Sequence, residues 1–69
     1  MIMTEQEFAE HIVDIRKKSG LSLRDFAKEI GFTHITIWNW EKASSTPHES
    51  VRPVMVERLR KKNFFNKKG

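Results

Sequence analysis

The chain of 69 residues allows one domain at most, because so short a chain buries only about 60% of its unfolded surface. It contains no cysteine, which excludes disulfide bonds and a cysteine-based zinc site, and its histidines lack metal-ligand spacing, so we expect no cofactor. The net charge of +4 is uneven: residues 1–57 hold seven Lys or Arg against nine Asp or Glu, whereas residues 58–69 hold six Lys or Arg and no acidic residue.

The basic end favours an anionic partner, with nucleic acid ahead of an anionic membrane surface; the alternative interpretation is a solvated, frayed terminus. No apolar run approaches the roughly 20 residues of a membrane span. Met1–Glu10 is acidic and lacks the apolar segment of a signal peptide. We therefore expect a cytoplasmic protein with no membrane partner.

The first predicted helix covers residues 4–18. Thr4 and Glu7 have the spacing of a capping box at its start. Basic residues precede Gly20, which suits a helix end with a left-handed cap. The apolar residues recur at i, i+4 and i+7 and share one face: Phe8, Ile12 and Ile15.

The second and third predicted helices cover residues 22–30 and 33–42. Ser22 and Thr33 are hydroxyl residues at the N-cap positions, and Gly31 ends the second helix. The second helix carries apolar residues at i, i+3, i+4 and i+7: Leu23, Phe26, Ala27 and Ile30.

A short break carrying a glycine joins these two helices, which is typical of a helix-turn-helix. Such a unit needs a small side chain, here Ala27, where the helices approach each other. It needs Gly31 where the backbone turns through positive φ. It also needs apolar side chains on the inner face of the third helix, and Ile37 and Trp40 have that spacing.

The fourth predicted helix covers residues 51–62 and follows a turn at residues 47–50. Ser50 is the expected cap, which places Pro53 in the first turn, where the backbone N–H groups have no partner within the helix. The expected apolar stripe consists of Val51, Val54, Met55 and Leu59.

Residues 12–47 resemble the helix-turn-helix domain of the Cro/phage-repressor, or xenobiotic-response-element-like, family of bacterial and phage regulators. The matching stretch is Ser22–Lys42, SLRDFAKEIGFTHITIWNWEK. Arg16 matches the arginine that the family places late in the first helix, paired with a glutamate that closes the third, here Glu41.

The resemblance implies an all-α, four-helix, lambda-repressor-like DNA-binding domain, which we expect over residues 1–63. Residues 64–69 are then a basic, flexible tail. Leu23 stands where the family often has a glutamine that reaches DNA. Phe64 and Phe65 in the tail leave open three roles: disorder, contact with the DNA backbone, or a contact between subunits.

A recognition helix reads base edges with the residues near its N-terminus. The expected base contacts are Thr33, His34, Ile35, Thr36, Trp38 and Asn39. Asn39 suits bidentate binding of adenine, and Ile35 suits a thymine methyl group. The expected phosphate contacts are Ser22, Arg24, Lys28, Lys42, Ser44 and Ser45.

Two of these residues keep alternative interpretations. His34 is either a base contact or an ordinary surface histidine. Trp38 points away from the expected core, and it contacts DNA, contacts a partner, or covers the loop Ala43–Pro47.

The sequence therefore predicts a sequence-specific, double-stranded DNA-binding transcriptional regulator, a small phage- or plasmid-type repressor that binds a palindromic operator as a homodimer. The alternative is a protein-interaction module, such as the antitoxin of a toxin–antitoxin pair or a phage protein that captures another regulator. We expect no enzymatic activity, because no nucleophile–base set, Gly-rich phosphate loop or metal cluster is present in the sequence.

Overall fold

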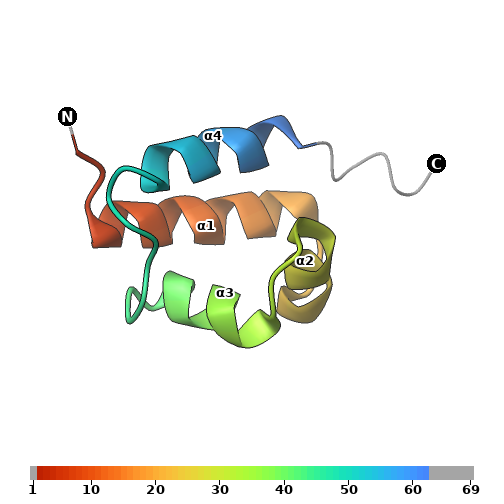
Figure 1. Ribbon diagram of the computed structural model, residues 1–69. Coiled ribbons are helices and arrows are strands. Elements are labelled where there is room, and N and C mark those ends of the chain that lie inside the picture. Colours follow the sequence, from red (N-terminus) through yellow and green to blue (C-terminus); the bar gives the residue numbers. More distant parts are fainter. Residues whose placement is uncertain (1, 63–69) are drawn as a thin grey trace.

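The computed structural model describes residues 2–62, and in this range it contains four α-helices and no strand (Figure 1). The helices are α1 Glu5–Ser19, α2 Leu23–Ile30, α3 His34–Glu41 and α4 Arg52–Lys61. The predicted all-α class is confirmed, and each helix begins and ends within one residue of its predicted bounds. The predicted tail at residues 64–69, with the roles considered for Phe64 and Phe65, lies outside the described residues.

Helix α1 lies in the middle of the molecule (Figure 1). Helix α3 lies on one side of it, helix α4 lies on the other, and α2 is placed near the C-terminal end of α1. Arg52 at the start of α4 pairs with Glu5, and Arg60 near its end pairs with Asp14, so α1 and α4 run in the same direction. The basic end of α4 is therefore separated from α3 by α1. None of these four helices is both long and apolar enough to cross a membrane.

Side-chain caps define the start of the first three helices. Thr4 accepts a hydrogen bond from the backbone N–H of Glu7 at 3.1 Å, and the Glu7 carboxylate accepts one from the backbone N–H of Thr4 at 2.9 Å. Both halves of the predicted capping box are thus present. Ser22 and Thr33 accept from the backbone N–H groups three residues ahead, as their N-cap positions predict.

The start of α4 differs from the prediction. Val51, not Ser50, occupies the N-cap position, and no side chain caps this helix. The Ser50 hydroxyl lies 2.8 Å from Nδ1 of His48. The hydroxyl that was expected to cap α4 is therefore bonded to a side chain of the preceding turn. Pro53 lies in the first helical turn as predicted, where its missing N–H removes no helical hydrogen bond.

The core is formed by apolar side chains from all four helices. They are Phe8, Ala9, Ile12, Ile15, Phe26, Ala27, Ile37, Trp40, Val56 and Leu59. Trp40 joins α3 to α1 and to the α2–α3 connection. The centre of its ring lies 5.3 Å from that of Phe8 in α1 and 4.9 Å from that of Phe32 in the connection, and both contacts are edge to face.

The apolar stripe predicted for α4 is wrong in part. Val51 and Val54 are exposed, whereas Val56 and Leu59 are buried. The side of α4 that faces α1 carries Arg52, Val56 and Leu59, which are spaced at i, i+4 and i+7. Arg52 is the first of these three residues. A charged residue therefore holds an inward position, which a pattern of apolar residues alone does not reveal.

Arg52 ties three distant segments together. Its Nε donates to the Pro47 carbonyl at 3.0 Å, and its Nη1 donates to the Met3 carbonyl at 3.0 Å. Nη2 lies 3.6 Å from the Glu5 carboxylate. Only 12% of the Arg52 side chain is exposed, so these bonds form in a partly desolvated site. The guanidinium therefore fixes the loop before α4 against the start of α1.

Replacing Arg52 by methionine should destabilise the fold by about 1–3 kcal/mol, because the apolar stem is kept while two carbonyls lose charged donors. Chemical unfolding followed by circular dichroism measures this difference. Arg58→Met is the matched control, since Arg58 is exposed on the same helix, and it should change the free energy of unfolding by less than about 0.5 kcal/mol. Equal losses in the two variants would show that Arg52 does not join the segments.

A second structural prediction concerns Ala43, whose φ of +59° is in the left-handed region. A side chain is unfavourable there, so Ala43→Gly should raise the free energy of unfolding by about 1 kcal/mol. Ser44→Gly is the control, because Ser44 lies outside that region and loses only the entropic advantage of a side chain. Thermal or urea unfolding should show opposite signs for the two substitutions; destabilisation by both would contradict the strain assigned to Ala43.

Candidate nucleic-acid interface

A connection of three residues, Gly31–Thr33, joins α2 to α3. Gly31 has a φ of +84°, and the backbone N–H of Phe32 donates to the Ala27 carbonyl at 2.9 Å, which closes the end of α2. Thr33 then caps α3 directly. Ala27 is 1% exposed in the core cluster, which fits the predicted need for a small side chain between the helices.

Helix α3 has one buried face and one face toward solvent. Ile37 and Trp40 are buried, with exposed fractions of 0% and 6%. The other side carries four residues at i, i+3, i+4 and i+7, which share one face of a helix. We call this set the outer stripe: Ile35, Trp38, Asn39 and Lys42. Ile35 is 55% exposed and Trp38 is 49% exposed, although both are large apolar side chains, while Asn39 is half-buried.

The outer stripe contains three of the six predicted base contacts, Ile35, Trp38 and Asn39. The other three lie at the N-terminal end of α3. Thr33 is exposed, but its hydroxyl caps the helix and lies 2.9 Å from the Thr36 hydroxyl, so these two hydroxyls are partners of each other. His34 and Thr36 are half-buried at the sides of the stripe.

Lys42 makes a contact beyond those predicted from the sequence. Its Nζ lies 4.5 Å from the centre of the Trp38 ring, a cation–π contact between positions i and i+4. An exposed contact of this kind contributes about 0.5–1 kcal/mol. The contact holds the Lys42 ammonium group beside the exposed Trp38 indole. A lysine four residues after a tryptophan on one helical face is the sequence signal that would have predicted this contact.

The six predicted phosphate contacts are all exposed. Ser22, Arg24 and Lys28 belong to α2 or its cap, whereas Lys42, Ser44 and Ser45 follow α3. The two groups are therefore at the two ends of α3 (Figure 1). The Ser22 hydroxyl also accepts the backbone N–H of Asp25 at 3.1 Å, so its role as a helix cap is established independently of any ligand.

The predicted pair of Arg16 and Glu41 is present. The guanidinium donates two hydrogen bonds to the carboxylate, at 2.6 and 3.1 Å, between α1 and the end of α3. The bond from Glu41 raises the pKa of Arg16 above its usual value, although partial burial opposes the shift. The pair orients the C-terminal end of α3, with both charges occupied inside the protein.

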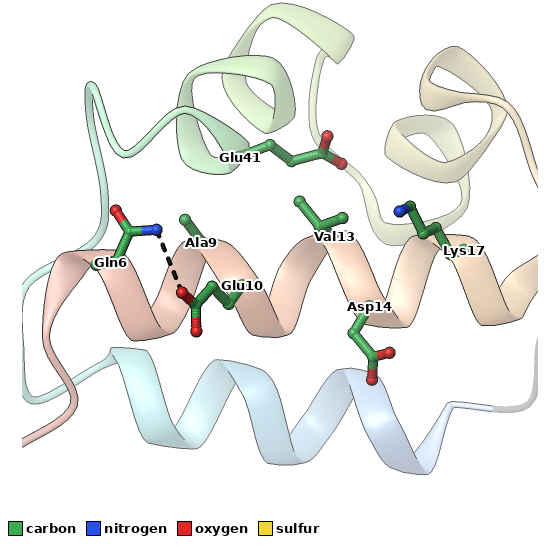
Figure 2. Close-up of a pocket in the computed structure, with 7 residues that line it drawn as sticks. All are labelled: Gln6, Ala9, Glu10, Val13, Asp14, Lys17 and Glu41. Atoms are coloured by element: carbon green, nitrogen blue, oxygen red, sulfur yellow. Dashed lines mark hydrogen bonds between the residues drawn. The ribbon is translucent and has the colours of Figure 1, made fainter.

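A shallow depression of about 330 Å³ lies on the outer face of α1 beside the end of α3 (Figure 2). Its acidic side chains have partners: Glu10 accepts from the Gln6 amide at 3.4 Å, Glu41 pairs with Arg16, and Asp14 pairs with Arg60 and Lys18. Within residues 2–62, no group of three or more His, Cys, Asp or Glu side chains is placed to hold a metal ion. The acidic side chains of the depression are therefore all engaged within the protein.

The chain was compared with protein-family models, curated proteins and solved structures, and none of them matches it. Evidence on function therefore comes from the geometry of α2, α3 and their surroundings.

The pKa of Asp14 lies below the ordinary value of an aspartate: desolvation acts to raise it, but Lys18 and Arg60 together outweigh that effect. A lowered pKa in the folded state adds stability above the unfolded pKa, and this stability is lost as the pH falls through the folded value. Asp14→Asn should therefore be less stable than the wild type at neutral pH and equally stable near a pH of about 2, as measured by urea unfolding at both pH values.

The control for this titration is Glu49→Gln, which removes the same charge from an exposed turn residue. It should change the free energy of unfolding at neutral pH by less than about 0.5 kcal/mol. A difference between Asp14→Asn and wild type that persists unchanged at the acidic pH would contradict the stabilising role of the charged carboxylate.

Proposed function

We propose that this chain is a sequence-specific, double-stranded DNA-binding regulator of the Cro/phage-repressor type. In this proposal α2 and α3 form the helix-turn-helix, and α3 enters the major groove. The observation that carries it is the division of α3: Ile37 and Trp40 anchor one face in the core, while Ile35 and Trp38 of the outer stripe stay exposed. A helix held in this way presents side chains to a groove without losing its packing.

The outer stripe has the chemistry that base recognition requires. The Asn39 carboxamide has no hydrogen-bond partner within residues 2–62, so its donor and acceptor are free to pair with N7 and N6 of adenine. The exposed Ile35 side chain suits a thymine methyl group. The proposal therefore favours an operator that contains A·T pairs where α3 reads it.

Positive charge at the two ends of α3 supports contact with the DNA backbone. Arg24 and Lys28 are exposed on α2, and Lys42 is exposed directly after α3. The N-terminal ends of α2 and α3 add the partial positive charge of their helix dipoles. Phosphate contacts at both ends would fix the register of α3 without contributing sequence specificity themselves.

A homodimer follows from the size of the reading surface. One short helix contacts too few base pairs to select a site in a genome, and two half-sites about 34 Å apart on a palindromic operator solve this problem. Bound at a promoter, such a dimer would act as a repressor by steric occlusion.

A second function is favoured by the apolar part of the outer stripe. Ile35 and Trp38 expose large hydrophobic surfaces, which is typical of a site for another protein. In this alternative the chain captures a protein partner, as an antitoxin or an inhibitor of another regulator does. The two functions differ in their salt dependence: each phosphate neutralised adds about −0.9 to the slope of log K against log salt.

Titration of duplex DNA with the purified chain at several salt concentrations tests the proposal. DNA binding through the groups named above should give a steep negative slope. No binding at low salt, or binding whose strength does not change with salt, would contradict DNA recognition and favour a protein partner.

Asn39→Ala should weaken binding to a specific site by about 1–3 kcal/mol and leave non-specific binding nearly unchanged. Gln6→Ala is the matched control, because it removes the same functional group from the exposed face of α1. Fluorescence anisotropy with specific and random duplexes measures both affinities. If Asn39→Ala weakens the two kinds of duplex equally, Asn39 has no part in base recognition.

Lys28→Ala should weaken binding to all duplexes alike and make the salt slope shallower by about one unit. Lys61→Ala is the control: this lysine is exposed on α4, which α1 separates from α3, and it should leave the slope unchanged. A change in sequence preference caused by Lys28→Ala would show that the residue does more than contact phosphate.

A further inference from the structure

The apolar part of the outer stripe consists of two adjacent side chains. Ile35 is 55% exposed and Trp38 is 49% exposed. The two residues are three positions apart in α3, so their side chains are neighbours on the surface of the helix. Covering such side chains removes apolar surface from water, which is favourable. The pair therefore favours a ligand that presents apolar groups at two adjacent positions.

The charges around this pair indicate which ligand covers it. Lys42 holds its Nζ 4.5 Å from the centre of the Trp38 ring, and Arg24 and Lys28 are exposed on α2 at the other end of α3. A second copy of the chain would bring the same cations against this face, and like charges repel each other. A polyanion is attracted instead. The charges therefore favour a nucleic acid over a second copy as the occupant.

The edges of the bases offer one kind of apolar group in the major groove, the 5-methyl group of thymine. At 1.5 Å of rise per residue, Ile35 and Trp38 are about 4.5 Å apart along the axis of α3. Successive nucleotides of one DNA strand are about 3.4 Å apart along the duplex. Because the two spacings are similar, the two side chains suit methyl groups on neighbouring base pairs.

An apolar side chain detects the methyl group but not the polar group beside it. Thymine presents the O4 acceptor next to its methyl group, whereas cytosine presents the N4 donor. The Ile35 side chain has no polar atom and cannot distinguish these two groups by hydrogen bonding. Cytosine methylated at C5 therefore offers Ile35 the same apolar contact as thymine.

We propose that Ile35 and Trp38 bind the 5-methyl groups of two neighbouring pyrimidines, and that 5-methylcytosine replaces thymine opposite Ile35. This inference rests on the proposed function, because it requires α3 to lie in the major groove. It adds a form of regulation to that function. A site with cytosine opposite Ile35 would bind the chain more tightly in its methylated form than in its unmethylated form.

Modified duplexes isolate the contribution of each methyl group. The starting duplex is a site that the full-length chain selects from a random pool. Deoxyuridine in place of thymine removes only the methyl group, and it should weaken binding about fourfold at each of two neighbouring positions. Opposite Ile35, 5-methylcytosine should bind about fourfold more tightly than cytosine. Fluorescence anisotropy measures all of these affinities.

Protein variants assign each methyl group to a side chain. Ile35→Ala should abolish the effect of the methyl group at one of the two positions, and Trp38→Ala should abolish it at the other. Both residues are exposed, so circular dichroism should show an intact fold in each variant. Asn39→Ala is the matched control, because it changes a polar residue of the same stripe, and it should keep both methyl effects.

The outcomes separate this inference from the function on which it rests. If the chain selects no site, the proposed function and the inference both fail. If it selects a site but deoxyuridine leaves the affinity unchanged, DNA recognition stands and the reading of methyl groups is overturned. Methyl effects that persist at full size in Ile35→Ala and Trp38→Ala would also overturn it. Equal affinities for cytosine and 5-methylcytosine opposite Ile35 would overturn the proposed regulation.

Discussion

The packing of Trp40 determines how α3 is rotated about its own axis, and the exposed surface of the molecule follows from that rotation. Its ring fills the space between Phe8 of α1 and Phe32 of the α2–α3 connection, with ring centres 5.3 and 4.9 Å away. Arg16 and Glu41 fix the end of the same helix by two hydrogen bonds. With one face held in these two ways, the opposite side of α3 is left toward solvent.

Much of the fold could be predicted from local signals. Hydroxyl caps such as Thr4 and left-handed glycines such as Gly31 act within a few residues, so the sequence reveals them. The direction of α4 and its contact face could not be predicted in the same way, because they depend on Arg52, whose partners are the carbonyls of Met3 and Pro47 in other segments. A charged side chain in an inward position reads as a surface residue until those partners are known.

In the candidate site, too, the sequence predicts local features but not the contacts between side chains. The helical repeat alone predicts that Ile35, Trp38 and Asn39 share the side away from Ile37 and Trp40, and the structure has this arrangement. It does not predict that neighbouring side chains engage one another, as the two threonine hydroxyls do at the start of α3 and as the lysine does over the indole. Such pairings reduce the number of groups that are free for a ligand, and they make the Asn39 carboxamide the most informative polar group of the stripe.

The central proposal is that the outer side of α3 reads a DNA sequence. Selection of bound duplexes from a random pool with the purified full-length chain tests it most directly. We predict enrichment of a consensus with A·T pairs in each half and two-fold symmetry, its half-sites about one helical turn apart. A pool that shows no sequence enrichment after repeated rounds would contradict DNA recognition by α3.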